Sequence, residues 1–204
     1  IGWYMVSSGL VDRVDVSHFR LSIHLVVAFI ILSLILWNYL NLKNLFFYGQ
    51  KIKIYICFIF LLLIFVQIII GAFVSGMDAG KIYNSWPLMG ASYFPNDSNF
   101  SDLLNFSAFS DPSLVQFFHR NLAYIITIYY LLILFKIYNE KIDKLYFAIN
   151  LVGFFLLTQI ILGILTLIYG AQIILASMHQ ISSIFLVSSS VYFLYLNTNQ
   201  LSSN

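Results

Sequence analysis

Four histidines, His18, His24, His119 and His179, are the side chains of this sequence best placed to perform chemistry. Each of the last three lies about six residues inside the start of a long apolar segment. At a helical rise of 1.5 Å per residue, all three imidazoles lie roughly 9 Å from the end of their helices. Ionisable side chains are costly inside a membrane and mark a functional site by default. One such histidine would be interpreted as a hydrogen-bonded packing residue, but three at one depth favour a cofactor site.

The ligands that these histidines offer suit a haem better than a bare metal ion. Two imidazoles on facing helices can bind the iron of a flat macrocycle from both sides, and His is a common axial ligand of haem iron. Zinc usually takes three or four protein ligands, and the sequence places no Cys or carboxylate at the depth of the histidines. We therefore predict a haem with two axial histidines.

A haem also carries two anionic propionates, which need cationic or amide partners. Arg120 directly follows His119 and is the first candidate, although a cation at the membrane interface is the alternative interpretation. Gln116 and Gln180 lie close to the histidines in sequence and are candidates for hydrogen bonds that orient the imidazoles. Further candidate cations are Arg13, Arg20 and Lys81.

The composition places these residues in a membrane protein. Of the 204 residues, 61% are hydrophobic and 9% are charged, whereas a soluble domain has about 25% charged residues. Helices are expected, because an open sheet would leave backbone groups unpaired in lipid. Five segments are long enough to cross a hydrocarbon core of about 30 Å: residues 19–41, 52–75, 113–137, 145–169 and 173–196.

We therefore predict an all-α polytopic transmembrane bundle of five full helices, with the end of a sixth at residues 1–8. The whole chain, 1–204, is expected to form one bundle. The net charge of +2 gives no indication of nucleic-acid binding. The single cysteine, Cys57, lies within an apolar run and is expected to be a small packing residue.

Lysines indicate the orientation of the bundle. By the positive-inside bias the two lysine-rich connections should be cytoplasmic. The histidine-bearing ends are then external, and the long connection 75–112 is expected to cover that face as a lid. The lysines of the two connections are Lys43, Lys51 and Lys53, and Lys136, Lys141 and Lys144.

The chain also contains an internal repeat of helix pairs. One helix ends with Gln67-Ile-Ile-Ile-Gly71 and another with Gln159-Ile-Ile-Leu-Gly163, and Ile1-Gly2 is a candidate third copy. Each copy is followed by an external connection and a helix that carries a histidine. Internal repeats with sites between the halves are common in membrane bundles, whereas Gly71 and Gly163 are also explained by close helix packing. Both interpretations stay open.

Several motifs together resemble the heme A synthase family along essentially the whole chain. The Trp-Pro-Leu-Met loop combined with the two later histidine motifs is highly specific. The similarity is greatest to the variety without paired external cysteines, found in proteobacteria and mitochondria. The motifs are Gly2-Trp-Tyr-Met-Val-Ser-Ser-Gly-Leu-Val-Asp12, Gly71-Ala-Phe-Val-Ser-Gly-Met-Asp-Ala-Gly80, Tyr83-Asn-Ser-Trp-Pro-Leu-Met89, Phe118-His119-Arg120 and Met178-His179-Gln180.

The resemblance implies a role for each site residue. His119 and His179 match the axial ligands of a haem b in the C-terminal half of the family, here residues 52–196, with Arg120 beside them. His24 matches a histidine of the N-terminal half, where the substrate haem is bound, and residues 1–41 would be a remnant of that half. The expected partner histidine and an acidic residue precede Ile1 in the family, so this fragment alone is expected to be inactive.

The activity implied is oxidation of the C8 methyl group of haem O to a formyl group, giving haem A for terminal oxidases. Haem O synthase would supply the substrate upstream. The location would be the bacterial inner membrane, or the mitochondrial inner membrane if the protein is organellar. The electron donor and any homo-oligomer stay open.

Two other functions are less well supported by the sequence. A di-haem membrane cytochrome that only transfers electrons would carry haems towards both membrane faces, whereas every candidate ligand here lies near one face. A transporter that uses histidines as a proton relay should have carboxylates within its helices, and none occurs at mid-depth.

Overall fold

Five long helices account for most of the computed structural model, which describes residues 2–3, 7, 16–43, 47–48, 51–198 and 200–201. Every one of them is long and apolar enough to cross a membrane. They begin and end within two residues of the predicted segments, so the predicted all-α membrane bundle is confirmed. They are α2 (His18–Leu42), α3 (Ile54–Gly76), α4 (Pro112–Asn139), α5 (Tyr146–Ile168) and α6 (Ile173–Thr198). Arg13 and most of the predicted sixth helix at 1–8 lie outside the described residues.

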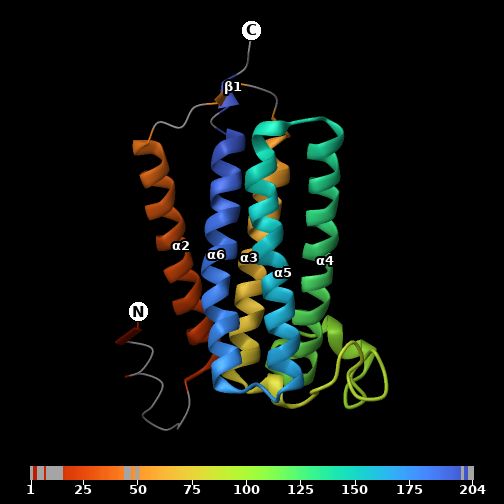
Figure 1. Ribbon diagram of the computed structural model, residues 1–204. Coiled ribbons are helices and arrows are strands. Elements are labelled where there is room, and N and C mark those ends of the chain that lie inside the picture. The colour runs from red at the N-terminus through yellow and green to blue at the C-terminus, as the bar shows by residue number, and fades with distance from the viewer. Residues whose placement is uncertain are drawn as a thin grey trace.

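The helices α3, α4, α5 and α6 form a four-helix bundle, and α2 packs on its side against α3 and α6 (Figure 1). Within the bundle α3 and α5 each pack against both α4 and α6, so α4 and α6 occupy opposite corners. Following the chain in Figure 1, α2, α4 and α6 run in one direction and α3 and α5 in the other. The three histidine-bearing helices are therefore parallel, as predicted.

The centre of the bundle is apolar and tightly packed. Side chains that are almost completely buried include Phe60, Ile137, Ile149, Val152 and Val187. Cys57 lies in the same core as a free thiol. Many large apolar side chains on the outer faces of the helices are exposed, as expected where lipid replaces water as the solvent. Examples are Phe58, Leu132, Phe135, Phe154 and Phe185.

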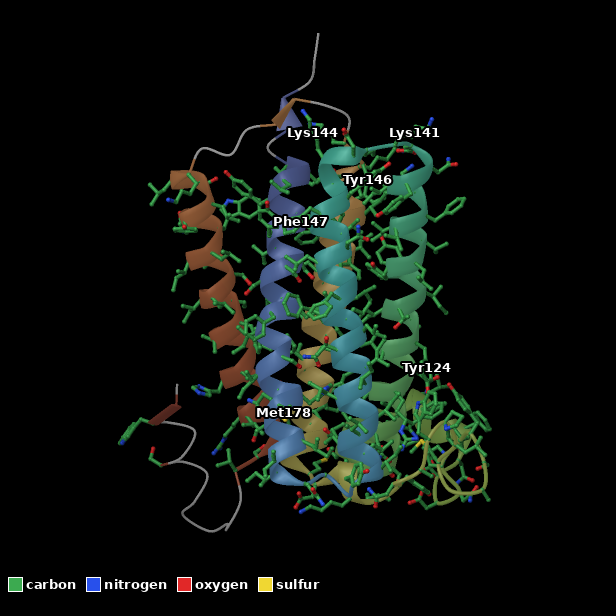
Figure 2. The ribbon with its side chains drawn as sticks, viewed as in Figure 1. Tyr124, Lys141, Lys144, Tyr146, Phe147 and Met178 are labelled. Carbon is green, nitrogen blue, oxygen red and sulfur yellow. The ribbon has the colours of Figure 1, made fainter. Side chains whose placement is uncertain are left out.

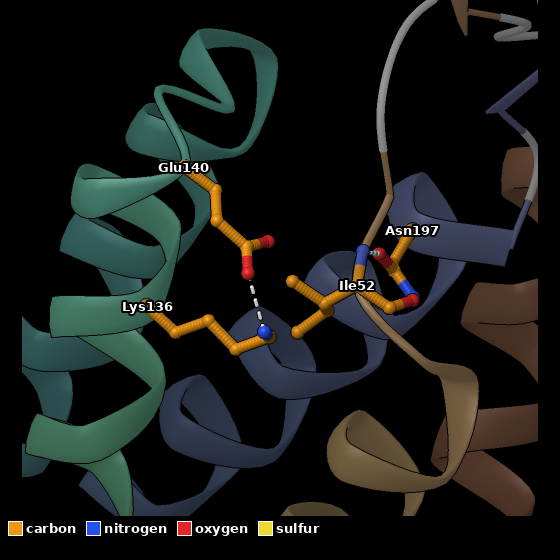
Figure 3. A network of polar contacts seen from close by, with 4 residues as sticks. All are labelled: Ile52, Lys136, Glu140 and Asn197. Atoms are coloured by element: carbon orange, nitrogen blue, oxygen red, sulfur yellow. Dashed lines mark hydrogen bonds and ion pairs between the residues drawn. The ribbon is translucent and has the colours of Figure 1, made fainter.

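Buried polar contacts hold together the end of the bundle that carries the lysines. The side chain of Asn197, on α6, accepts a hydrogen bond from the backbone N–H of Ile52 and donates one to its carbonyl, each at 3.0 Å (Figure 3). Nearby, the Tyr195 hydroxyl donates to the carbonyl of Leu40 at 3.0 Å. At the same end the short strands β1 (Phe47–Tyr48) and β2 (Gln200–Leu201) pair in parallel. The end of α6 therefore joins α2 and α3.

The opposite end carries the long connection between α3 and α4. It contains three short 3₁₀ helices, of which the first and third pack against long helices and the second packs against the third. Asp111 caps α4 by accepting hydrogen bonds from the N–H groups of Ser113 and Leu114, and Pro112 occupies the first helical position. The 3₁₀ helices are η1 (Ala79–Lys81), η2 (Phe100–Leu104) and η3 (Phe106–Ser110).

Candidate functional site

The imidazoles of His119 and His179 meet inside the bundle. Their ring centroids are 6.4 Å apart and their planes lie at 82°. His119 comes from α4 and His179 from α6, the two helices at opposite corners. Figure 2 shows Met178, the residue before His179, and Tyr124 toward the end opposite to Lys141 and Lys144. The structure therefore brings together two of the three predicted histidines, at the end away from the lysines.

Each of these imidazoles lies directly on a glycine of the preceding helix. A Cβ atom built on Gly71 of α3 would lie 3.1 Å from Cε1 of His119. A Cβ atom built on Gly163 of α5 would lie 3.1 Å from Cε1 of His179. Since carbon atoms make ordinary contacts at about 3.5–4.0 Å, a side chain at either position would crowd the ring. The two glycines are thus explained by the approach of an imidazole as well as by helix packing.

A glutamine one turn before each glycine binds the same histidine. The Nε2 amide of Gln67 donates to the backbone carbonyl of His119 at 3.0 Å, and its nitrogen lies 3.4 Å from Nε2 of that imidazole. The Nε2 amide of Gln159 donates to the carbonyl of His179 at 3.0 Å. The sequence reveals these glutamines as part of a repeat but gives them no role. The signal was their four-residue spacing from the glycines, which places each pair on one helix face.

The distance between the two imidazoles supports their assignment to a metal-centred group. Two imidazoles that approach one metal ion from opposite sides, with about 2.0 Å per metal–nitrogen bond, have ring centroids roughly 6 Å apart. The observed 6.4 Å fits that arrangement.

The donor set favours a macrocycle over a bare ion. No group of three or more His, Cys, Asp or Glu side chains that could hold a metal ion occurs among the residues that the structure describes. A structural zinc site usually needs four ligands. Two histidines are sufficient when a porphyrin supplies the remaining nitrogen atoms. The residues present therefore fit a haem.

Arg120 fastens the long connection to α4. Its guanidinium donates to the backbone carbonyls of Tyr83 (3.0 Å), Ser85 (2.9 Å) and Leu88 (3.2 Å). The Nε atom of Arg120 is buried and has no partner in the described part of the chain. A contact with a haem propionate stays a prediction. Arg120 thus contacts the irregular loop at 83–88 at three separate carbonyl groups.

The two glutamines suggested by the sequence do not contact the imidazoles. The amide of Gln116 donates to the carbonyl of Tyr83 at 3.0 Å, next to the contact of Arg120. Gln180 is exposed. Gln116 therefore supports the loop. Gln67 and Gln159, rather than Gln116 and Gln180, are the glutamines that form hydrogen bonds to His119 and His179.

The carboxylate of Asp97 provides a further link between the long connection and α4. Asp97 accepts hydrogen bonds from the hydroxyl groups of Ser113 (2.7 Å) and Tyr83 (2.9 Å). The hydrogen bond from Ser113 is the main cause that holds the pKa of Asp97 below its usual value. The pKa of Tyr83 is raised, first by burial and then by the hydrogen bond to Asp97 and its negative charge.

His24 lies apart from the other two ligand candidates, on α2. Its side chain is exposed, and a Cβ atom built on Gly2 would lie 3.3 Å from its Cε1 atom. The approach of a glycine to an imidazole thus occurs three times. His18 packs against Phe19 and Phe73 at the start of α2, with ring centroids 4.2 and 5.2 Å away.

Comparison with known proteins places these features in a family. The family model described as "Cytochrome oxidase assembly protein" matches residues 1–191. A protein of Pelagibacter ubique named "Heme A synthase" is 46% identical over 199 residues, which cover 98% of this chain and 59% of that protein. The proteins of the same name from Rickettsia bellii and Rickettsia prowazekii are 41% and 37% identical, over 92% and 97% of this chain and 57% and 60% of their own length. No solved structure matches the chain.

Proposed function

Because this chain belongs to the family of cytochrome oxidase assembly proteins, we propose that it acts in heme A synthesis, as its relatives' name states for them. The chain spans about three fifths of the length of those relatives. The reaction proposed is oxidation of the C8 methyl group of haem O to a formyl group. The observation that carries the proposal is the pair of imidazoles of His119 and His179, 6.4 Å apart inside a membrane bundle.

His119 and His179 are proposed to hold a haem b between α4 and α6. A haem held by these two residues would supply one-electron transfer. Gly71 and Gly163 let the rings approach the backbone of α3 and α5. Arg120 and Gln116 hold the loop at 83–88 against α4, which limits the access of water to this end of the bundle.

His24 is proposed to face the substrate haem. It lies on α2, outside the four-helix bundle, and Gly2 contacts its ring as Gly71 contacts that of His119. The proposed division of the chain follows: residues 1–41 belong to the substrate half and residues 52–196 to the haem b half. The shared arrangement of glycine and histidine in both halves supports this division.

The chain is a multi-pass membrane protein. The membrane proposed is the bacterial inner membrane, or the mitochondrial inner membrane for an organellar member. Haem O synthase is the class of enzyme that must supply the substrate. The formyl oxygen must come from dioxygen or water through successive hydroxylations of the methyl group; hydroxylation with dioxygen needs a reduced membrane or soluble carrier as electron donor, whereas hydroxylation with water needs an electron acceptor.

Heterologous expression tests the proposed function. The complete reading frame that carries this sequence is expressed with a haem O synthase in a host that lacks its own heme A synthase, and the extracted haems are separated. We expect haem A from the wild-type protein and from a variant with the exposed substitution Asn38→Ala. His119→Ala and His179→Ala should remove the reduced haem b absorption band and reduce haem A at least tenfold.

Two results would contradict the proposal in different ways. A normal haem b band in both histidine variants would show that these residues are not the axial ligands. A normal band in the wild-type protein without any haem A would instead favour the electron-transfer cytochrome.

A further inference from the structure

The two axial imidazoles lack the contact that usually orients a metal-bound histidine. In most metal sites the second ring nitrogen donates a hydrogen bond to a carbonyl or carboxylate, which fixes the plane of the ring. Neither His119 nor His179 has a partner for Nδ1 within the described residues. Something else must hold the two rings at their angle of 82°.

The repeated glutamine and glycine provide a second way to hold each ring. Gln67 binds the carbonyl of His119, and Gly71, one turn further along α3, accepts the Cε1 edge of the ring. One contact restrains the position of the α4 backbone, and the other restrains the side-chain torsion angles. Both contacts come from one face of a single helix, so their spacing is set by the rise of the helix.

The second copy repeats this geometry at the other corner of the bundle. Gln159 binds the carbonyl of His179, and Gly163 accepts the ring edge. The donor distances agree at 3.0 Å and the glycine distances at 3.1 Å. A donor distance of 3.0 Å is ordinary for an N–H···O hydrogen bond, so the repeat consists in the same pair of contacts made at the same four-residue spacing.

The copies differ in one respect that bears on the haem. The Gln67 amide nitrogen lies 3.4 Å from a ring nitrogen of His119. The Gln159 amide donates instead to the hydroxyl of Ser182 at 2.6 Å, and that hydroxyl donates to the carbonyl of His179 at 3.0 Å. Only the α3 copy therefore brings an amide dipole close to a ring nitrogen of its histidine.

We propose that Gln67 with Gly71, and Gln159 with Gly163, are positioning residues that set the orientation of the two axial imidazoles. This inference rests on the proposed haem site. Gln67 has a second effect, because the positive end of its amide dipole near the ring favours the reduced state of the iron.

Spectroscopy and potentiometry of the purified full chain test the inference. Gln67→Met and Gln159→Met keep the length of the side chain but remove the donor, and Gly71→Ala and Gly163→Ala crowd the ring edge. The readouts are the electron paramagnetic resonance spectrum of the ferric haem, which depends on the angle between the ring planes, and the midpoint potential.

The chain offers matched controls for both kinds of substitution. Gly80→Ala crowds Ala171 to a similar degree, with 3.3 Å between the added Cβ and the Cβ of Ala171, but touches no histidine. Thr158→Val, beside Gln159, removes a hydroxyl that donates only to the carbonyl of Phe154 on its own helix.

We expect all four site variants to shift the ferric spectrum and both controls to match the wild-type protein. The potential should fall more for Gln67→Met than for Gln159→Met. Gln67→Glu, which preserves the shape and adds negative charge, should lower it further, and this variant decides the question if Gln67→Met does not retain haem. Unchanged spectra and potentials in haem-loaded variants, with only a lower melting temperature, would overturn the inference. A wild-type protein without a low-spin haem signal would instead overturn the proposed haem site.

Discussion

The carboxylate of Asp97 accepts a hydrogen bond from the hydroxyl of Ser113 over 2.7 Å, which joins the middle of the long connection to the first turn of α4. Tyr83 donates to the other carboxylate oxygen, so one acidic group links three points of this end of the molecule. The backbone carbonyl of Tyr83 is in turn bound by Gln116 and Arg120. The connection is therefore a structured part of the protein, fastened to the helix that carries His119.

Acidification should loosen this connection. The pKa of Asp97 is held below its ordinary value of about 3.9, mainly by the hydrogen bond from Ser113. The stability that Asp97 contributes is fully present above that ordinary value and is lost as the pH falls through the lower value of the folded protein. Hydrogen exchange of residues 83–111 should therefore accelerate below about pH 4 relative to the helices.

Two variants make the pH prediction specific to Asp97. Asp97→Asn should exchange faster already at neutral pH and should lose most of the extra acceleration in acid. Asp143→Asn, at the other end of the bundle, should behave like the wild-type protein. An acid response that persists in full in Asp97→Asn would exclude Asp97 as its source.

Replacing Arg120 should release the loop at 83–88. The guanidinium binds three carbonyls, and a hydrogen bond to a charged group contributes about 1.5–3 kcal/mol. Arg120→Lys keeps the charge but loses the planar set of donors, so we expect a loss of roughly 2 kcal/mol in unfolding free energy. Thermal unfolding of the purified variants in detergent measures this loss of unfolding free energy.

The control for this substitution is Lys81→Ala. Lys81 forms an exposed ion pair with Asp78, and such pairs contribute about 0–1 kcal/mol. Equal losses of unfolding free energy from the two substitutions would mean that the contacts of Arg120 with the loop stabilise the protein no more than an exposed ion pair does.

Asn197 should be essential for the packing of the lysine-bearing end. Asn197→Leu would leave the N–H and carbonyl of Ile52 buried without partners, at a cost of about 2–4 kcal/mol for the two groups. Asn197→Asp can still accept from the N–H of Ile52 but places a charged acceptor against the Ile52 carbonyl in a buried site, so it should cost at least as much. Asn38→Ala, on the exposed side of α2, should change the unfolding free energy by no more than about 0.5 kcal/mol.

The orientation in the membrane can be measured independently of any haem. The lysines at positions 141 and 144 lie at the end opposite to Met178 (Figure 2). By the positive-inside bias we expect a reporter fused at Lys141 to be cytoplasmic and one fused at Asn96 to be external. Activity of a periplasm-specific reporter at Lys141 would reverse the orientation and place the histidine pair in the inner leaflet.

Much of the fold could be predicted because a bilayer imposes strict length and polarity on helices. The apolar segments and their directions, including the parallel helices of His24, His119 and His179, follow from hydropathy and the number of crossings. The start of α4 coincides with a local signal, Pro112 after Asp111, and the other boundaries follow the ends of the apolar runs. These features depend on neighbours in sequence, which is why the boundaries agree to within two residues.

The parts that could not be predicted depend on backbone atoms of distant segments. Arg120 binds carbonyl groups more than thirty residues away, and no pattern of side chains records where an irregular loop presents its carbonyls. Gln67 and Gln159 likewise bind the carbonyls of histidines on the next helix. The sequence shows their four-residue spacing from Gly71 and Gly163. The contact of each glutamine and glycine with a histidine becomes evident only from the distances in the structure.

The diagonal placement of α4 and α6 has a consequence for how the protein is assembled. Each of these helices packs against α3 and α5, and the two meet one another through the imidazoles of His119 and His179. A group held by both histidines would act as a cross-brace between these two corners. We therefore expect protein loaded with the proposed haem to be cleaved by membrane proteases more slowly than the haem-free protein.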